Sequence, residues 1–373
     1  VVSRHFDSVF GDPSEEDHSL DATWANARDT EAATGALGEL GYRHPRMAAE
    51  RLAAMHASPR YRQLPNNIKS RFDALMPRVL EAAASTPGAD ETLARMLDLI
   101  EAIGRRGAYL ALLQQYPQAL RRVADLMSAS RWGAQFLTRH PILLDEMLDA
   151  RSLDNAPDWK AFRASLAEEL EALEPDMERQ MDVMRERHHA QVFRLLTQDL
   201  AGLLTVEKLA DHLSELADIV LDLTLPLCWR RIKIRHREAP KFAVISYGKL
   251  GGKELGYGSD LDVVFLYDDA DEPDKDRAQE VYGAFVRKLI TWLTLRTAAG
   301  ELFEFDERKI RLNAGGITIH HKPNGSRGGD HSNLRVSIPI FFTHHKRSVR
   351  VFACGLQKIW WAVVRVNVDG RHA

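Results

Sequence analysis

The chain has 373 residues, of which 45% are hydrophobic and 28% are charged, and its formal net charge is −3. A chain of this length can bury the cores of two or three domains. It contains no run of 18 uncharged apolar residues, which excludes an apolar membrane-spanning helix. The small negative net charge argues against general nucleic-acid binding, because phosphate backbones attract cationic surfaces.

The first residues and the two cysteines bear on the compartment. Residues 1 to 6 lack the basic-then-apolar order of a signal peptide. Cys228 and Cys354 are far apart and outside any metal-ligand spacing, so we expect packed free thiols and neither a disulfide nor a zinc site. We therefore expect a cytoplasmic protein with no membrane partner.

The N-terminal part of the chain is predicted to be helical after a short linker. Residues 1 to 21 are polar, which predicts a flexible linker. From residue 22 to about residue 150 apolar residues recur at helical spacing, and Pro117 and Pro141 suit first helical positions. One stripe consists of Leu93, Met96, Leu97, Ile100 and Ile103. We expect a bundle of short helices over residues 22–150.

Residues 151 to 239 are predicted to form a second helical bundle with two long helices. Their stripes are Met177, Met181, Met184, His188, Gln191 and Leu195, and then Leu209, Leu213, Leu216, Val220, Leu223 and Leu227. The matching seams predict antiparallel packing across a turn at residues 202–205. His188 and His189 could be read as ligands, but histidines at a helix seam are more often hydrogen-bonded packing residues.

Pro226 and a basic run mark the end of this bundle. Proline removes a backbone donor, so we expect Pro226 to kink or end its helix. The basic run from Arg230 to Arg237 could steer a charged partner. We favour the alternative, in which these side chains complement the carbonyl groups and dipole at the C-terminal end of the helix.

The stretch that carries chemistry is residues 241–269, KFAVISYGKLGGKELGYGSDLDVVFLYDD. Residues 242–246 form a short run that is nearly all apolar, typical of a strand that is central in its sheet. Gly248, Gly251 and Gly252 follow, and glycine lets backbone N–H groups approach a phosphate closely. The glycine spacing matches neither the Walker phosphate loop nor the Rossmann fingerprint.

Two aspartates follow the glycines at positions i and i+2. Asp260 and Asp262 alternate with apolar residues, so a strand through this segment would turn both carboxylates to one face. At ~3.3 Å rise per residue their Cα atoms would lie roughly 6–7 Å apart, which lets the carboxylates converge on divalent ions. Glycine turns and strand-end aspartates are each ordinary loop chemistry. Their combination in this order favours a nucleotide and metal site.

The order of two glycines and then Asp-x-Asp resembles the nucleotidyltransferase superfamily. Within it, the chain is similar to the glutamine synthetase adenylyltransferase family, whose catalytic repeats carry G-K-L-G-G-x-E-L and then S-D-hydrophobic-D. Residues 248–255 read GKLGGKEL and residues 259–262 read SDLD. The GYGSDLD form resembles the repeat that adds AMP, and one copy of the motif is present. The resemblance extends to residues 105–112, RRGAYLAL, and 189–194, HAQVFR, where it implies scaffold and regulatory roles.

This resemblance implies a fold, a reaction and a set of site residues. The fold would be α+β and predominantly α-helical, a helical bundle followed by a nucleotidyltransferase-type α/β domain with a small mixed sheet at residues 240–316. The reaction would transfer AMP from ATP, with Mg²⁺, to a tyrosine hydroxyl of glutamine synthetase, and a PII-type signal protein is a candidate regulator. The catalytic metal ligands would be Asp260, Asp262 and Asp306. The nucleotide would contact Gly248, Lys249, Gly251, Gly252, Lys253 and Ser259.

The residues after the aspartates contain one further helix and then depart from the family pattern. Residues 278–295 are predicted to form an amphipathic helix whose stripe is Val281, Phe285, Leu289 and Trp292. Gly300 ends a turn, and residues 302–306 are predicted to form a strand that brings Asp306 to the sheet. The family continues with R-L-R-P-x-G, whereas residues 307–316 read ERKIRLNAGG.

Residues 317–373 are an atypical basic tail. Residues 307–373 contain 12 Lys and Arg residues and three Asp and Glu residues, and we find no sustained helical or strand period after Ile317. Disorder is one expectation for this tail, and a frame-shifted or divergent terminus explains its composition. The alternative is a nucleic-acid-binding tail in which Trp360 and Trp361 stack on bases.

The departure after residue 307 bears on activity. We expect such a chain to bind Mg·ATP weakly and to transfer AMP slowly. Two alternatives to an enzyme that modifies glutamine synthetase stay open. One is a nucleotidyltransferase with a different acceptor, and the other is an impaired fragment that acts as a helical regulatory module.

Overall fold

The computed structural model describes residues 15–147, 155–246, 248–268 and 273–303, and the backbone of five short strands between residues 311 and 364. The chain divides into two compact units. Unit 1 comprises Val1–Asn155 and Leu196–Ala201, and unit 2 comprises Ala156–Leu195 and Gly202–Ala373. Among the described residues, no helix combines the length and the apolar character that crossing a membrane requires.

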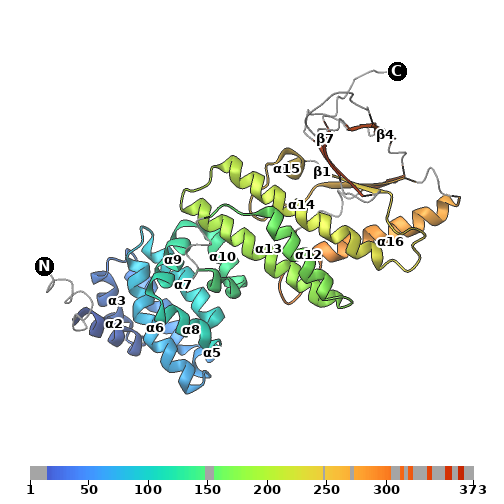
Figure 1. The fold of residues 1–373 in the computed structure, drawn as a ribbon. Coiled ribbons are helices and arrows are strands. Elements are labelled where there is room, and N and C mark those ends of the chain that lie inside the picture. The colour runs from blue at the N-terminus through green and yellow to red at the C-terminus, as the bar shows by residue number, and fades with distance from the viewer. Residues whose placement is uncertain are drawn as a thin grey trace, which may run out of the picture. The chain divides into compact units, whose positions relative to one another are not determined.

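Unit 1 is built from short helices (Figure 1). They are α2 Glu15–Ala25, α3 Thr30–Glu39, α4 Pro45–Ala57, α5 Pro59–Arg62, α6 Asn66–Ala84, α7 Ala89–Ile103, α8 Gly107–Gln115, α9 Pro117–Ala129, α10 Arg131–Arg139 and the 3₁₀ helix η1 Pro141–Met147. The predicted stripe of α7 is buried throughout. Pro117 lies in the first turn of α9 and Pro141 begins η1, which confirms both predictions.

Unit 2 contains the long helices, except for the last turn of α13, which belongs to unit 1. They are α12 Trp159–Ala172, α13 Met177–Leu200, α14 Val206–Arg230 and, further along the chain, α16 Lys275–Thr294. Helices α13 and α14 lie side by side in opposite directions (Figure 1), and the Thr224 hydroxyl is 3.4 Å from the Met184 sulfur between them. The predicted stripe of α14 is buried in full. In α13 the first stripe residue, Met177, is exposed, so the buried seam begins at Met181.

We predicted that Pro226 kinks or ends its helix. It does not end the helix, because α14 continues to Arg230. The residues that follow the proline explain the continuation. Leu227, Cys228 and Trp229 are all buried. Burying three such side chains outweighs the one hydrogen bond that proline removes.

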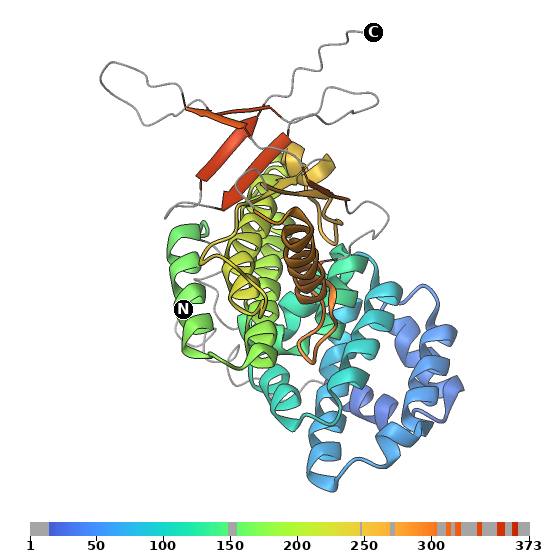
Figure 2. The same cartoon turned by 90° about the vertical axis from the view of Figure 1, so that its right-hand side faces the viewer.

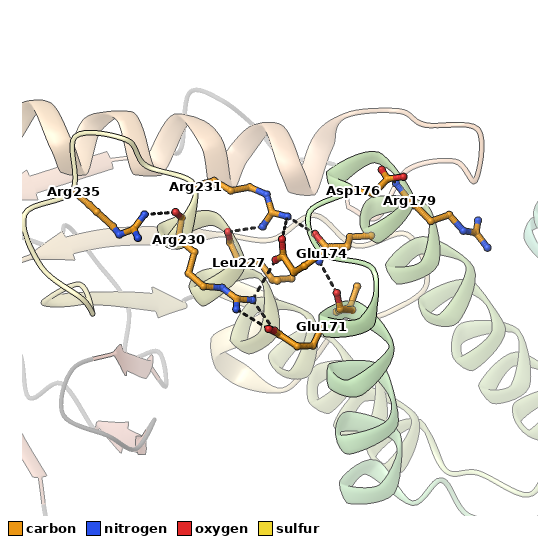
Figure 3. A network of polar contacts seen from close by, with 10 residues as sticks. Glu171, Glu174, Asp176, Arg179, Leu227, Arg230, Arg231 and Arg235 are labelled. Atoms are coloured by element: carbon orange, nitrogen blue, oxygen red, sulfur yellow. Dashed lines mark hydrogen bonds and ion pairs between the residues drawn. The ribbon is translucent and has the colours of Figure 1, made fainter.

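Polar contacts hold the end of α14 (Figure 3). The Arg230 guanidinium donates to both oxygens of Glu171 at 3.1 and 2.9 Å, and Arg231 donates to Glu174 at 2.8 Å and to the carbonyl oxygen of Leu227 at 3.0 Å. Arg235 donates to the carbonyl oxygen of Arg230. These contacts confirm the capping interpretation of the basic run. They join the α12–α13 turn to the segment that leads into the sheet.

The central sheet of unit 2 is small and mixed. Its order is β3-β2-β1-β6-β7, with β2 and β3 parallel and the other pairs antiparallel. The strands are β1 Phe242–Ser246, β2 Val263–Tyr267, β3 Arg311–Ala314, β6 Val349–Cys354 and β7 Trp360–Val364, and a separate pair is β4 Thr318–His321 with β5 Leu334–Ser337. Strand β1 is central, as predicted. We found no sustained strand period in the sequence after Ile317. The strands β4 to β7 show that this expectation was wrong.

Helix α16 packs on the face of β1 and β2 and runs beside the strands in both views (Figures 1 and 2). All four predicted stripe residues are buried. The Phe285 ring lies 4.9 Å from that of Phe242 on β1, and the Tyr282 ring lies 4.7 Å from that of Tyr267 on β2. The described fold is therefore predominantly helical α+β, as predicted from the sequence.

Candidate active site

The pairing of β1 with β2 brings the glycine turn to the aspartates. The two strands are antiparallel, with Ser246 opposite Val263. Gly248 comes two residues after the end of β1, and Asp262 comes one residue before the start of β2. Antiparallel pairing places the end of one strand beside the start of the next. The register alone therefore sets Gly248 near Asp262.

Gly248 touches the Asp262 carboxylate. Its φ angle is +59°, in the region that favours glycine, and a β-carbon built on it would lie 2.2 Å from Asp262 Oδ2. No side chain fits at that distance, so residue 248 must be glycine for Asp262 to keep this position. We predicted that the glycines let the backbone approach a ligand. At Gly248 the structure shows a close approach to the protein's own carboxylate.

The two aspartates lie just outside β2, not within it. Strand β2 begins at Val263, whereas we predicted a strand that includes Asp260 and Asp262. The reason is that β1 ends at Ser246 and offers no ladder partner to residues 260–262. Burial still alternates through the segment, because Leu261 is buried while both aspartates are partly exposed. Extended backbone keeps this alternation without a partner strand.

The glycines after Gly248 form the short helix α15, Gly248–Gly252. Its end has the hydrogen bonds of a Schellman motif: the Lys253 amide donates to the carbonyl of Leu250 at 3.3 Å, and the Glu254 amide donates to that of Lys249 at 2.7 Å. Lys253 occupies the left-handed position of this motif, with φ +56°. Glycine usually stands there, so the lysine holds a strained backbone.

The predicted nucleotide contacts differ in their surroundings. The side chain of Lys249 is exposed, and Gly251 is buried. Lys253 Nζ lies 3.4 Å from Asp211 Oδ1 on α14, a partner that the sequence did not indicate. Ser259 Oγ accepts a hydrogen bond from the Gly256 amide at 3.0 Å, which stabilises the turn before the aspartates.

A buried arginine on α13 fixes the segment that follows α16. Arg185 is fully buried, and its guanidinium donates to the carbonyl oxygens of Trp292 and Leu295 at 2.7 and 2.6 Å and to that of Gly300 at 3.0 Å. Burial lowers the pKa of Arg185 to about 10. We did not predict a role for Arg185 from the sequence. The only sequence clue to its burial is that it directly follows Met184, a residue of the predicted seam.

The two histidines of α13 act on the same segment. His189 Nε2 lies 2.7 Å from the carbonyl oxygen of Glu301, and the His188 ring packs edge-on against Phe303 at 5.1 Å. Both histidines are buried. His189 is a hydrogen-bonded packing residue, as we favoured from the sequence, and His188 packs through its ring.

The predicted third ligand lies on the continuation of this segment. Leu302 and Phe303 are not in a strand, which corrects the start of the strand predicted at residues 302–306, and Asp306 lies outside the described residues. The described part of the chain contains no cluster of three or more His, Cys, Asp or Glu residues that could hold a metal. Mg²⁺ is commonly held by one or two carboxylates together with substrate phosphates. Asp260 and Asp262 are partly exposed residues with hard oxygen donors, which fit that pattern, and one of these oxygens, Asp262 Oδ1, is itself buried.

The fold and the site together define a mostly helical α+β protein. In it a glycine turn after strand β1 lies against a pair of aspartates just before strand β2 of a mixed sheet. The sequence profile of the glutamate-ammonia ligase adenylyltransferase family matches residues 120–312. The chain belongs to this family.

Relatives in several bacteria carry the name bifunctional glutamine synthetase adenylyltransferase/adenylyl-removing enzyme. The protein from Aromatoleum aromaticum is 68% identical over 328 residues, which cover 88% of this chain and 33% of the relative. That from Ralstonia nicotianae is 52% identical, covering 86% of this chain and 34% of the relative. That from Neisseria meningitidis serogroup A is 40% identical over 381 residues, covering 99% and 40%. The chain thus spans about a third of the length of the first two relatives.

Proposed function

We propose that this chain transfers AMP from ATP to a tyrosine hydroxyl of glutamine synthetase and releases pyrophosphate. The contact between Gly248 and Asp262 carries this proposal, because it unites the glycine turn and the carboxylate pair in one site. The family match and the names of the relatives support AMP transfer with glutamine synthetase as the acceptor protein. We also infer that residues 240–316, together with the strands β6 and β7 of the same sheet, form the nucleotidyltransferase-type domain, that the protein works in the cytoplasm, and that a PII-type protein regulates it.

The proposed reaction makes and breaks one bond at phosphorus. The tyrosine oxygen bonds to the α-phosphorus of ATP, the bond from that phosphorus to the bridging oxygen breaks, and pyrophosphate leaves with the electron pair. A bound Mg²⁺ would neutralise phosphate charge and lower the pKa of the attacking hydroxyl. Asp260 and Asp262 would hold the ion through their oxygens.

The remaining roles belong to residues around the turn. The exposed ammonium of Lys249 would offset the charge of the leaving pyrophosphate. Gly251, Gly252, Lys253 and Ser259 are proposed to line the nucleotide. Asp306 is proposed to complete the metal site and to accept the tyrosine proton.

The test is transfer of label from ATP to protein. The chain is incubated with Mg²⁺, purified bacterial glutamine synthetase and ATP labelled at either the α- or the γ-phosphate. We expect slow incorporation of α-label into a tyrosine of glutamine synthetase, with the γ-label released as pyrophosphate. Label on another acceptor would favour a nucleotidyltransferase of different specificity. Mg·ATP binding without any transfer would favour the regulatory-module alternative.

A further inference from the structure

Unit 1 contains a pocket of about 450 Å³ between α4, α5, α6 and the end of α7. Its floor is apolar and aromatic: the side chains of Met55, Tyr61, Leu64 and Phe72 line it, and each is buried. The Tyr61 and Phe72 rings lie 5.3 Å apart. Small-molecule sites are typically concave, largely apolar and roughly 300–1,000 Å³ in volume. The pocket therefore has the size and floor of a ligand site.

The rim of this pocket is cationic. Arg60, Arg105 and Arg106 line it, together with one carboxylate, Glu101. Glu101 is already engaged, because Arg60 lies 3.4 Å from its Oε1 and Arg51 lies 3.9 Å from its Oε2. Within the described part of unit 1, no ion pair forms at Arg105 or Arg106. The Arg106 guanidinium lies over the Tyr109 ring at 5.8 Å, a contact that leaves its N–H groups for a ligand together with those of Arg105.

The turn that carries these two arginines is fixed before any ligand arrives. It connects the end of α7 to the start of α8, and the Arg71 guanidinium donates to the carbonyl oxygen of Gly107 at 3.1 Å. Gly104, at the start of the turn, is buried, and a β-carbon there would lie 3.2 Å from the carbonyl oxygen of Ile100. The fixed backbone holds the two arginines at the pocket, so the entropy lost on binding is mainly that of their side chains.

Basic side chains also lie near His56, which follows the floor residue Met55 in the sequence. The pKa of His56 is lowered first by burial and then by the positive charges of Arg28 and Lys69. Arg62 lowers it further, while Asp73 acts in the opposite direction. Positive charges therefore outnumber negative ones around His56.

We propose that this pocket binds a small organic anion that combines a phosphate or carboxylate group with a flat apolar part. The anionic oxygens accept hydrogen bonds from Arg105 and Arg106, since guanidinium groups recognise planar carboxylate and tetrahedral phosphate oxygens well. The flat part lies on Tyr61 and Phe72. This site is separate from the Gly248–Asp262 turn in sequence and in unit, and the proposal does not depend on AMP transfer.

The experiment is calorimetric titration of the full chain with phenyl phosphate, benzoate and phenol, in EDTA so that metal-dependent nucleotide sites are silent. We expect saturable binding of at least one of the two anions and none of neutral phenol at the same concentration. Binding should weaken as salt is raised, because the charges are near the surface. Phenyl phosphate alone would identify phosphate as the group recognised, and benzoate alone would identify carboxylate.

Variants place the binding in this pocket. R105Q/R106Q should weaken the affinity for the anion at least tenfold. Ala102→Trp, on the exposed edge of the pocket, should block anion binding without changing the buried floor. Arg46→Gln is the matched control, because Arg46 is an exposed arginine of α4 that does not line the pocket. No saturable anion binding, binding equal for phenol, or binding that R105Q/R106Q and A102W leave unchanged would overturn the proposal.

Discussion

Gly248 and Asp262 lie so close that a β-carbon on residue 248 would fall 2.2 Å from the Asp262 carboxylate. Gly248→Ala should therefore displace Asp262 and abolish AMP transfer. The left-handed φ of +59° adds about 1–2 kcal/mol of destabilisation for any L-residue. Urea unfolding and the labelled-ATP assay measure the two effects. Gly256→Ala is the control, because its β-carbon would meet the Ser259 hydroxyl at an ordinary 3.8 Å; equal losses in both variants would show that the contact has no special role.

Lys253 is strained, and glycine should relieve the strain. Lys253→Gly should raise the free energy of unfolding by about 0.5–1 kcal/mol, because the left-handed backbone suits glycine and the ion pair with Asp211 is exposed and weak. Lys253→Ala removes the same ion pair but keeps the strain, so it should not stabilise the fold. If the ammonium group contacts the nucleotide, both variants should lose transfer equally. A glycine variant less stable than the alanine variant would contradict this account.

Leu216 lies in the middle of the buried α14 seam and is fully buried. Leu216→Ala should lower the free energy of unfolding by roughly 2–5 kcal/mol, since it leaves a cavity in a packed core. Val206→Ala on the same helix is the control, because Val206 is 76% exposed. Thermal or urea unfolding compares the two variants. Similar small changes in the free energy of unfolding of both would contradict the packing of Leu216 in a buried seam.

Cys228 should be chemically inert in the folded protein. It is a buried free thiol, and burial raises its pKa to about 12. The thiolate is the reactive form, so at pH 8 very little of it exists in the native state, whereas an unfolded cysteine has a pKa of about 8.5. Iodoacetamide followed by peptide mass mapping should label Cys228 in urea and not in buffer. Rapid labelling of the native chain would show that the site is accessible.

The helices and the central strand could be predicted from the sequence because their patterns are strong. The α14 stripe holds over six positions, and residues 242–245 are all apolar, as suits the central strand β1. Single residues misled where packing overrides local preference. Pro226 lies inside α14 because buried side chains follow it, and Met177 is exposed although it continues the α13 stripe.

The site could be predicted in part. The motif predicted which residues matter, but the contact of Gly248 with Asp262 depends on the register of two strands, which no local pattern shows. The Asp-x-Asp alternation also suggested a longer β2. The alternation of buried and partly exposed residues continues before Val263, where no partner strand pairs with the chain. Arg185 was missed because the charge of a buried arginine is satisfied by carbonyl groups that are more than 100 residues away in sequence.

The central claim is that Asp260 and Asp262 serve AMP transfer through a divalent ion, and Mg²⁺ titration of the α-label assay tests it most directly. Asp260→Asn and Asp262→Asn should each abolish transfer at every Mg²⁺ concentration while leaving the unfolding free energy within about 0.5 kcal/mol, because each removes a metal ligand and no core volume. Asp268→Asn, at the other end of β2, should transfer as the parent does. Near-parental transfer by either Asp260→Asn or Asp262→Asn at saturating Mg²⁺ would contradict the claim.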